Sequence, residues 1–120
     1  MIVFDSYAWL EYFSGSSKGN VVKGIIGSSE EILTPSICLA EIKRKYLKEN
    51  KEFESRIKFI RARSKIINID SNISLAAADM SVKNNLYLID ALIYVCALLI
   101  NSELLTGDLH FKNLEKIKFL

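Results

Sequence analysis

Four acidic residues occupy places in the sequence where a carboxylate is either unusual or well placed for chemistry. Asp5 ends the apolar run MIVF, and Asp90 interrupts the otherwise apolar stretch LIDALIYVCALLI. Glu41 lies in the segment TPSICLAEI, and Asp108 follows LLTG. An ionised carboxylate is costly to bury unless something pairs with it. Asp90 in particular therefore needs an explanation.

A shared metal ion would explain all four acids if they converge in the fold. Two carboxylates at roughly 5 Å repel by about 3 kcal/mol at an effective dielectric constant near 20. Several such pairs would offset much of the stability of a small domain, about 5–15 kcal/mol, so the cluster would need protons or a cation. Oxygen ligands without His or Cys suit Mg²⁺ or Mn²⁺ and not zinc. Water bound to such a metal can attack a phosphodiester in line.

The elements that must position these acids alternate between strands and helices. Apolar runs predict strands at 1–4, 31–35, 65–69, 103–106 and 117–120. Helical spacing predicts helices at 7–13, 20–26, 37–50, 53–64, 72–84 and 88–101, a loop at 15–19 and a helical turn at 109–114. This alternation favours an α/β fold with a parallel sheet covered by helices on both faces. Ligands bind such sheets outside the carboxyl ends of the strands, near which the four acids fall.

Helix starts and buried faces can also be predicted. Ser36 is expected to cap the helix that contains Glu41, and Asp70 or Ser71 is expected to cap the helix at 72–84. Cys38, Ile42 and Tyr46 recur at helical spacing and predict the buried face of the Glu41 helix.

Each acid also has a plainer interpretation. Asp90 could cap the N-terminus of its helix, and Asp5 could cap the first helix. Glu41 lies between apolar and basic neighbours on its helix and could belong to a solvated face. Asp108 could be an ordinary turn residue.

Composition limits the classes of protein that fit. The 120 residues suit one domain over 1–120, and half of them are hydrophobic while a quarter are charged. The net charge of +2 neither requires nor excludes nucleic acid. The longest apolar stretch falls short of the roughly 20 residues that cross a bilayer, and the N-terminus lacks the basic start of a signal peptide. Cys38 and Cys96 are expected to be buried thiols, so we expect a cytoplasmic protein without a membrane partner.

Four fragments together resemble a known family. MIVFDSYAWLEYF, TPSICLAEI, LIDALIYVCALL and LLTGDLHF are similar, in order and spacing, to PIN-domain ribonucleases of the kind that serve as the VapC-type toxin of VapBC toxin–antitoxin pairs. The resemblance covers essentially the whole chain. It matches the family's acids to Asp5, Glu41, Asp90 and Asp108, with Ser6 and Thr106 as hydroxyl residues beside the site.

The resemblance implies a three-layer α/β/α sandwich with a central, mainly parallel sheet. It further implies RNA cleavage that depends on Mg²⁺ or Mn²⁺ held by those four acids, homodimerisation, and inhibition by a small cognate antitoxin protein. One position departs from the family pattern. Many members carry another acid two residues after the last aspartate, where this chain has His110, its only histidine.

Basic residues give independent support for an RNA substrate, because lysine and arginine hold phosphates without reading sequence. They gather on and after the Glu41 helix, at Lys43, Arg44, Lys45, Lys48, Lys51, Arg56, Lys58, Arg61, Arg63 and Lys65. The same residues could instead form solvated helix faces paired with Glu49, Glu52 and Glu54.

Two other functions remain open on the sequence. A phosphoacceptor signalling domain of the receiver type is also an alternating α/β chain of this length, and Asp70 would be its phosphorylated residue. That interpretation leaves Glu41 and Asp90 unexplained. A PIN-like domain that binds RNA or a partner without cutting is the second alternative, and the four intact acids count against it.

Overall fold

Five short strands form one sheet in the computed structural model, which describes residues 1–120. The strands are β1 (Ile2–Phe4), β2 (Ile32–Pro35), β3 (Ser64–Ile67), β4 (Glu103–Thr106) and β5 (Ile117–Phe119). All neighbouring strands are parallel, in the order β3-β2-β1-β4-β5. The strand order therefore reverses between β1 and β4, and a crevice for ligands is expected where their carboxyl ends meet.

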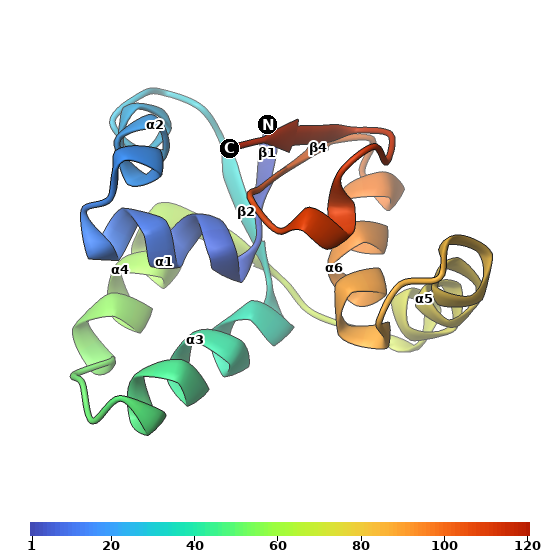
Figure 1. The fold of residues 1–120 in the computed structure, drawn as a ribbon, viewed down its shortest axis with the longest axis horizontal. Coiled ribbons are helices and arrows are strands. Elements are labelled where there is room, and N and C mark those ends of the chain that lie inside the picture. Colours follow the sequence, from blue (N-terminus) through green and yellow to red (C-terminus); the bar gives the residue numbers. More distant parts are fainter.

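Helices cover both faces of this sheet, which confirms the predicted three-layer α/β/α sandwich (Figure 1). The helices are α1 (Ser6–Ser14), α2 (Ser17–Ile26), α3 (Ser36–Lys48), α4 (Glu54–Arg63), α5 (Ser71–Asn84) and α6 (Leu88–Leu99), with a short 3-10 turn, η1 (Leu109–Phe111). Figure 1 shows α1, α2 and α4 on one side of the sheet and α5 and α6 on the other.

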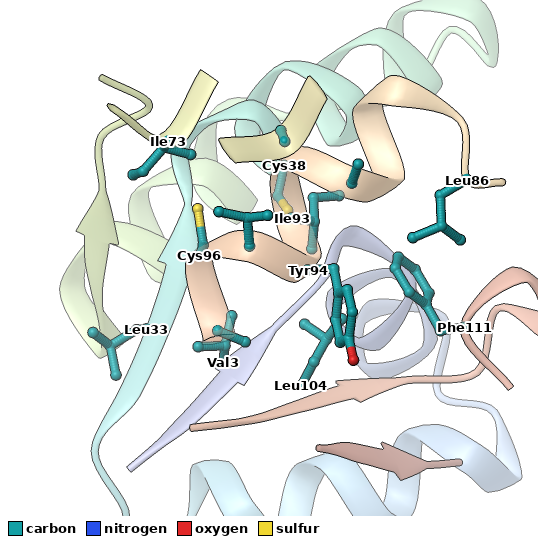
Figure 2. Close-up of a cluster of buried hydrophobic side chains, with 14 residues drawn as sticks. Val3, Leu33, Cys38, Ile73, Leu86, Ile93, Tyr94, Cys96, Leu104 and Phe111 are labelled. Carbon is teal, nitrogen blue, oxygen red and sulfur yellow. The ribbon is translucent and has the colours of Figure 1, made fainter. Parts of the chain in front are cut away.

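Alternation along the strands divides the buried side chains into two cores. Ile2 and Phe4 of β1 join the core formed with α1, α2 and α4, whereas Val3 joins the core beneath α5 and α6. Figure 2 shows the second core, where Val3, Leu33 and Leu104 of the strands face side chains of α6. The two cores hold the sheet rigidly, and so they also hold the residues that follow its strands.

Helix α3 crosses from one core to the other. Cys38 packs in the core beneath α6, while Ile42 and Tyr46 pack in the core on the α1 side, which confirms the face predicted from the sequence. Glu41 lies between these anchors on α3. Its backbone position is therefore fixed by packing against both faces of the sheet.

Two contacts position α1. Trp9 is fully buried and its Nε1 donates a 3.0 Å hydrogen bond to Thr34 Oγ1 on β2. Gly19 lets α2 approach α1 closely, because a Cβ atom there would lie 2.2 Å from the carbonyl oxygen of Glu11. The first contact holds α1 against the sheet, and the second holds α2 against α1.

Two local predictions, the Ser36 cap and the length of the first loop, are wrong. Ser36 does not cap α3, because β2 runs through Pro35 directly into the helix and leaves Ser36 as its first helical residue. The Ser36 Oγ instead accepts a 3.2 Å hydrogen bond from the Ile69 backbone N–H. The loop predicted at 15–19 is shorter than expected, since the Ser16 side chain caps α2. The helix predicted to run to about Asn101 ends close to that residue, at Leu99, and Asn101 adopts the left-handed conformation just beyond it.

Other local predictions are confirmed. Asp70 caps α5, with its Oδ1 accepting a 2.8 Å hydrogen bond from the Ile73 backbone N–H. Cys38 and Cys96 are buried free thiols. No single helix is both long enough and apolar enough to span a membrane. Only α5 and α6 taken together have that length and composition, and they are bent by 112° relative to each other.

Candidate active site

Asp5 lies at the carboxyl end of β1 and is almost completely buried, with 2% of its surface exposed. Its Oδ1 accepts a 2.9 Å hydrogen bond from the Ala8 backbone N–H, so Asp5 caps α1 as one of its two sequence interpretations predicted. Hydrogen bonds from Ala8 and Thr106 only partly offset the cost of burying this carboxylate. The capping role is therefore compatible with a second role at the strand end.

Asp108 follows the neighbouring strand β4 and is held by the turn that it begins. Its backbone N–H donates a 3.0 Å hydrogen bond to Thr106 Oγ1, and its Oδ1 accepts a 2.9 Å bond from the His110 backbone N–H. Gly107 packs against the Tyr7 ring so tightly that a Cβ atom would lie 2.3 Å from Tyr7 Cε1. These contacts bring Asp108 back over the end of the sheet next to α1.

Glu41 reaches this edge of the sheet from α3. Its Oε1 accepts a 2.9 Å hydrogen bond from the hydroxyl of Ser6, the residue after Asp5. The Glu41 side chain is half-buried, and it does not belong to a fully solvated helix face. The Ser6 hydroxyl therefore connects the carboxylate on α3 to the first residue of α1.

Asp90 lies in the first turn of α6 and does not cap it. The N-cap position belongs to Tyr87, and no side chain there accepts a hydrogen bond from the helix. The interpretation of Asp90 as an N-cap is therefore wrong. Its carboxylate is 15% exposed, and Asp90 Oδ2 lies 3.3 Å from His110 Nδ1.

Three of the four carboxylic acids, Asp5, Glu41 and Asp90, have raised pKa values. Burial, followed by the charges of Asp108 and Glu41, raises the pKa of Asp5 from 3.8 to about 7, against hydrogen bonding from Thr106 and Ala8. Burial raises the pKa of Glu41, and the nearby charges of Asp90 and Asp108 raise it further. Burial and the Asp108 charge raise the pKa of Asp90, while His110 lowers it.

No lysine or arginine forms an ion pair with any of the four acids. The only nitrogen side chain in contact with them is the imidazole of His110, whose Nδ1 lies 3.1 Å from Asp108 Oδ1. At a separation of 4.8 Å or less, two ionised carboxylates repel by about 3 kcal/mol or more at an effective dielectric constant of 20. A divalent cation would relieve this repulsion.

The donor atoms fit a metal ion in part. One ligand atom each from Asp90, Asp108 and His110 lie within 4.8 Å of one another, while Asp5 and Glu41 lie outside this tight group. Carboxylate oxygens and an imidazole nitrogen are ordinary ligands for divalent metals. The membership of His110 was not predicted. The signal available for it was its place two residues after Asp108, within the same tight turn.

Comparison with protein families identifies the family of this chain. Residues 2–117 match the family model of the PIN domain, so the chain belongs to the PIN domain family. No curated protein matches the chain in sequence.

Solved structures share the fold at low sequence identity. A toxin–antitoxin complex from Klebsiella pneumoniae superposes with a TM-score of 0.82 at 22% identity, covering 98% of this chain and 96% of the other. VapBC2 from Rickettsia felis, bound to a DNA fragment from its promoter, superposes with a TM-score of 0.79 at 19% identity, covering 100% of this chain and 99% of the other. VapC20 from Mycobacterium tuberculosis, a toxin that cleaves the sarcin–ricin loop, superposes with a TM-score of 0.77 at 12% identity, covering 97% of this chain and 96% of the other.

The receiver-type alternative is wrong. A receiver-type sheet has the order 2-1-3-4-5 and places its third strand at the centre, whereas β3 is an edge strand here. Asp70, the residue that alternative needed, lies beyond β3 and uses its carboxylate to cap α5.

Proposed function

We propose that this PIN-domain protein is a metal-dependent endoribonuclease that cleaves RNA phosphodiester bonds. Residues 1–120 form a single nuclease domain in this proposal, and the protein acts in the cytoplasm as the toxin of a toxin–antitoxin pair. The observation that carries the proposal is the gathering of Asp5, Glu41, Asp90 and Asp108 at the point where the strand order reverses, without a lysine or arginine to neutralise them. The structural similarity to toxin–antitoxin proteins supports the biological role.

The four acids hold Mg²⁺ or Mn²⁺ in this proposal. A bound divalent ion supplies a water of lowered pKa and shields the charge of a phosphate. Asp90 and Asp108 are the direct ligands, because their oxygens approach closely enough to share one ion. Hydrogen bonds from Ala8 and Ser6 hold the carboxylates of Asp5 and Glu41 in place, where they would bind water molecules of the ion. Thr106 fixes the backbone of Asp108.

A basic cleft beside Glu41 supports a nucleic-acid substrate. The cleft has a volume of about 370 Å³ and is lined by Ser6, Leu10, Glu41, Arg44, Lys45, Lys48 and Glu49. Arg44 and Lys48 form no ion pair, so they are free to contact phosphates, whereas Lys45 pairs with Glu49 at 2.8 Å. A strand of RNA that crosses this cleft brings a phosphate to the acids.

Part of the basic cluster predicted from the sequence has structural partners instead. Arg56 pairs with Glu52, and Lys65 pairs with Glu31. Arg63 donates hydrogen bonds to four carbonyl oxygens at and after the end of α2, those of Ile25, Ile26, Ser28 and Glu30. The RNA-binding role is therefore assigned to the α3 residues next to the site.

We also propose two protein partners, a cognate antitoxin and a second copy of this chain. A groove of about 530 Å³ between α3 and α4 has apolar residues Leu39, Phe53 and Ile57 and a basic rim, which suits an acidic amphipathic segment of the antitoxin. Leu75 and Val82 lie seven residues apart on α5 and are 71% and 86% exposed, which suits a homodimer contact. Co-expression with the protein encoded beside this gene and sedimentation of the isolated chain test the two partners.

The decisive experiment is cleavage of an end-labelled single-stranded RNA by the purified protein. We expect cleavage with Mg²⁺ or Mn²⁺, none with EDTA, and none by the Asp108→Asn variant with either ion. A folded protein that binds this RNA but does not cut it with either metal would contradict the proposal and favour a non-cleaving PIN-like domain.

A further inference from the structure

His110 is inserted between two carboxylates of the candidate site. Its Nδ1 lies 3.1 Å from Asp108 Oδ1 and 3.3 Å from Asp90 Oδ2. The donor set around Asp90 and Asp108 therefore does not consist of oxygen alone, whereas the prediction of Mg²⁺ or Mn²⁺ from the sequence assumed oxygen ligands only.

The imidazole is held in this place from two sides. The backbone N–H of His110 donates to Asp108 Oδ1 at 2.9 Å, which fixes the residue on η1. The ring also packs edge to face against Tyr87, with ring centroids 5.2 Å apart and an interplanar angle of 78°. A ring restrained in this way loses little freedom when its nitrogen binds a ligand.

The separations suit ligands that share one ion. Neighbouring ligands of an octahedral ion with bonds of about 2.1 Å lie about 3 Å apart. The two Nδ1–oxygen separations of 3.1 and 3.3 Å are close to that value. Imidazole nitrogen is a softer ligand than carboxylate oxygen, and it favours transition metals over Mg²⁺.

We propose that His110 supplies a nitrogen ligand, through Nδ1, to the ion held by Asp90 and Asp108, and that this ligand makes the site select Mn²⁺ over Mg²⁺. The inference rests on the proposed function only in that these carboxylates bind a divalent ion. His110 is thus a residue that determines metal specificity, at a position where an acidic side chain would supply oxygen.

Calorimetric titration of the protein with Mn²⁺ alone and with Mg²⁺ alone tests the selectivity. We expect the ratio of Mn²⁺ affinity to Mg²⁺ affinity to fall at least tenfold in His110→Asp, which substitutes oxygen for nitrogen. His110→Ala should weaken Mn²⁺ binding and leave Mg²⁺ binding nearly unchanged. Leu109→Ala is the matched control, because Leu109 lies in the same turn with 71% of its surface exposed.

Pulsed electron paramagnetic resonance of the Mn²⁺ complex tests the ligand directly. His110 is the only histidine of the chain, so in a tag-free protein any imidazole nitrogen coupled to Mn²⁺ must belong to it. We expect this coupling in the wild type, a change in its frequencies after ¹⁵N-histidine labelling, and its loss in His110→Asp.

The outcomes separate this inference from the proposed function. Mn²⁺ binding without nitrogen coupling, or an affinity ratio unchanged in His110→Asp, would overturn the role of His110 and leave a carboxylate metal site intact. Failure of the wild type to bind either ion would overturn both. Thermal unfolding of His110→Ala in EDTA is expected to stay close to that of the wild type, because 54% of the His110 side chain is exposed. His110→Asp should unfold at a lower temperature in EDTA, because it places a third carboxylate beside Asp90 and Asp108.

Discussion

Ser6 Oγ lies 2.9 Å from Glu41 Oε1 and donates a hydrogen bond to it, across 35 positions of the sequence. Ser6 is the first residue of α1, and the residue before it, Asp5, caps the same helix. The start of α1 therefore holds one acid in its cap and a second acid through the adjacent hydroxyl. Any shift of this helix end moves both carboxylates together.

Ser6→Ala should weaken the site more than the fold. Loss of the hydroxyl removes the hydrogen bond that lowers the pKa of Glu41, so that pKa should rise further above 4.5. We expect RNA cleavage to fall about tenfold and the free energy of unfolding to change by about 1 kcal/mol or less. Ser14→Ala is the control, because Ser14 lies at the far end of α1 and is exposed. Equal activities of the two variants would show that this hydrogen bond does not matter to the site.

Metal ions should stabilise the folded protein. A cation that binds only the folded state raises the free energy of unfolding by about 2.7 kcal/mol at one hundred times its dissociation constant. We expect a higher melting temperature in millimolar Mn²⁺ or Mg²⁺ than in EDTA. The double variant Asp5→Asn, Asp90→Asn should lose this response, because it removes two of the repelling charges that the cation neutralises. An equal shift in the wild type and in this variant would place the bound metal elsewhere.

Much of the fold follows from the sequence because its signals are local. The apolar runs, Pro35, and the spacing of Cys38, Ile42 and Tyr46 reflect strand burial and one helix face, and the structure has them as predicted. The prediction that Ser36 caps α3 was wrong. Serine before an apolar run is usually a helix cap, but here β2 continues without a break into the helix. Only the register of β2 against β3, a long-range feature, brings Ser36 to Ile69.

The candidate site was predictable in its acids and not in its contacts. Asp90 stood out because it interrupts an apolar helix, and the structure rules out the capping alternative. Asp5 carried two interpretations, and the structure shows that its capping bond and its burial beside other acids occur together. His110 could not be placed, because its approach to Asp90 joins segments that are distant in the sequence. The catalytic roles of the acids stay predictions.

The metal-free protein should lose stability as the pH rises from about 4 to about 7. The pKa of Asp5 is raised in the folded state from 3.8 to about 7, so the unfolded chain ionises first and the folded state keeps its proton. The free energy of unfolding therefore falls across this window, by about 4 kcal/mol from this group. Asp5→Asn removes that loss and keeps the cap, since asparagine caps as well as aspartate.

Urea unfolding in EDTA at pH 4.5 and pH 8 measures this difference. We expect Asp5→Asn to be more stable than the wild type by about 1 kcal/mol at pH 4.5 and by about 4 kcal/mol at pH 8. Glu41 and Asp90 have raised pKa values of the same sign, so the variant should retain a shallower decline. Parallel curves for the two proteins would mean that Asp5 ionises in the folded state as readily as in the unfolded chain.

Asp90→Asn should remove activity while preserving the fold. The side chain makes no capping bond in α6, so its replacement by a neutral amide of the same size costs the helix little. We expect metal-dependent cleavage of single-stranded RNA to fall by at least about a hundredfold, because a ligand of the ion is lost. Asp70→Asn is the matched control, since Asp70 caps α5 and asparagine can replace it in that role. Circular dichroism of both variants checks the fold. Full cleavage activity in Asp90→Asn, together with loss of activity in Asp70→Asn, would show that the Asp90 carboxylate takes no part in the chemistry.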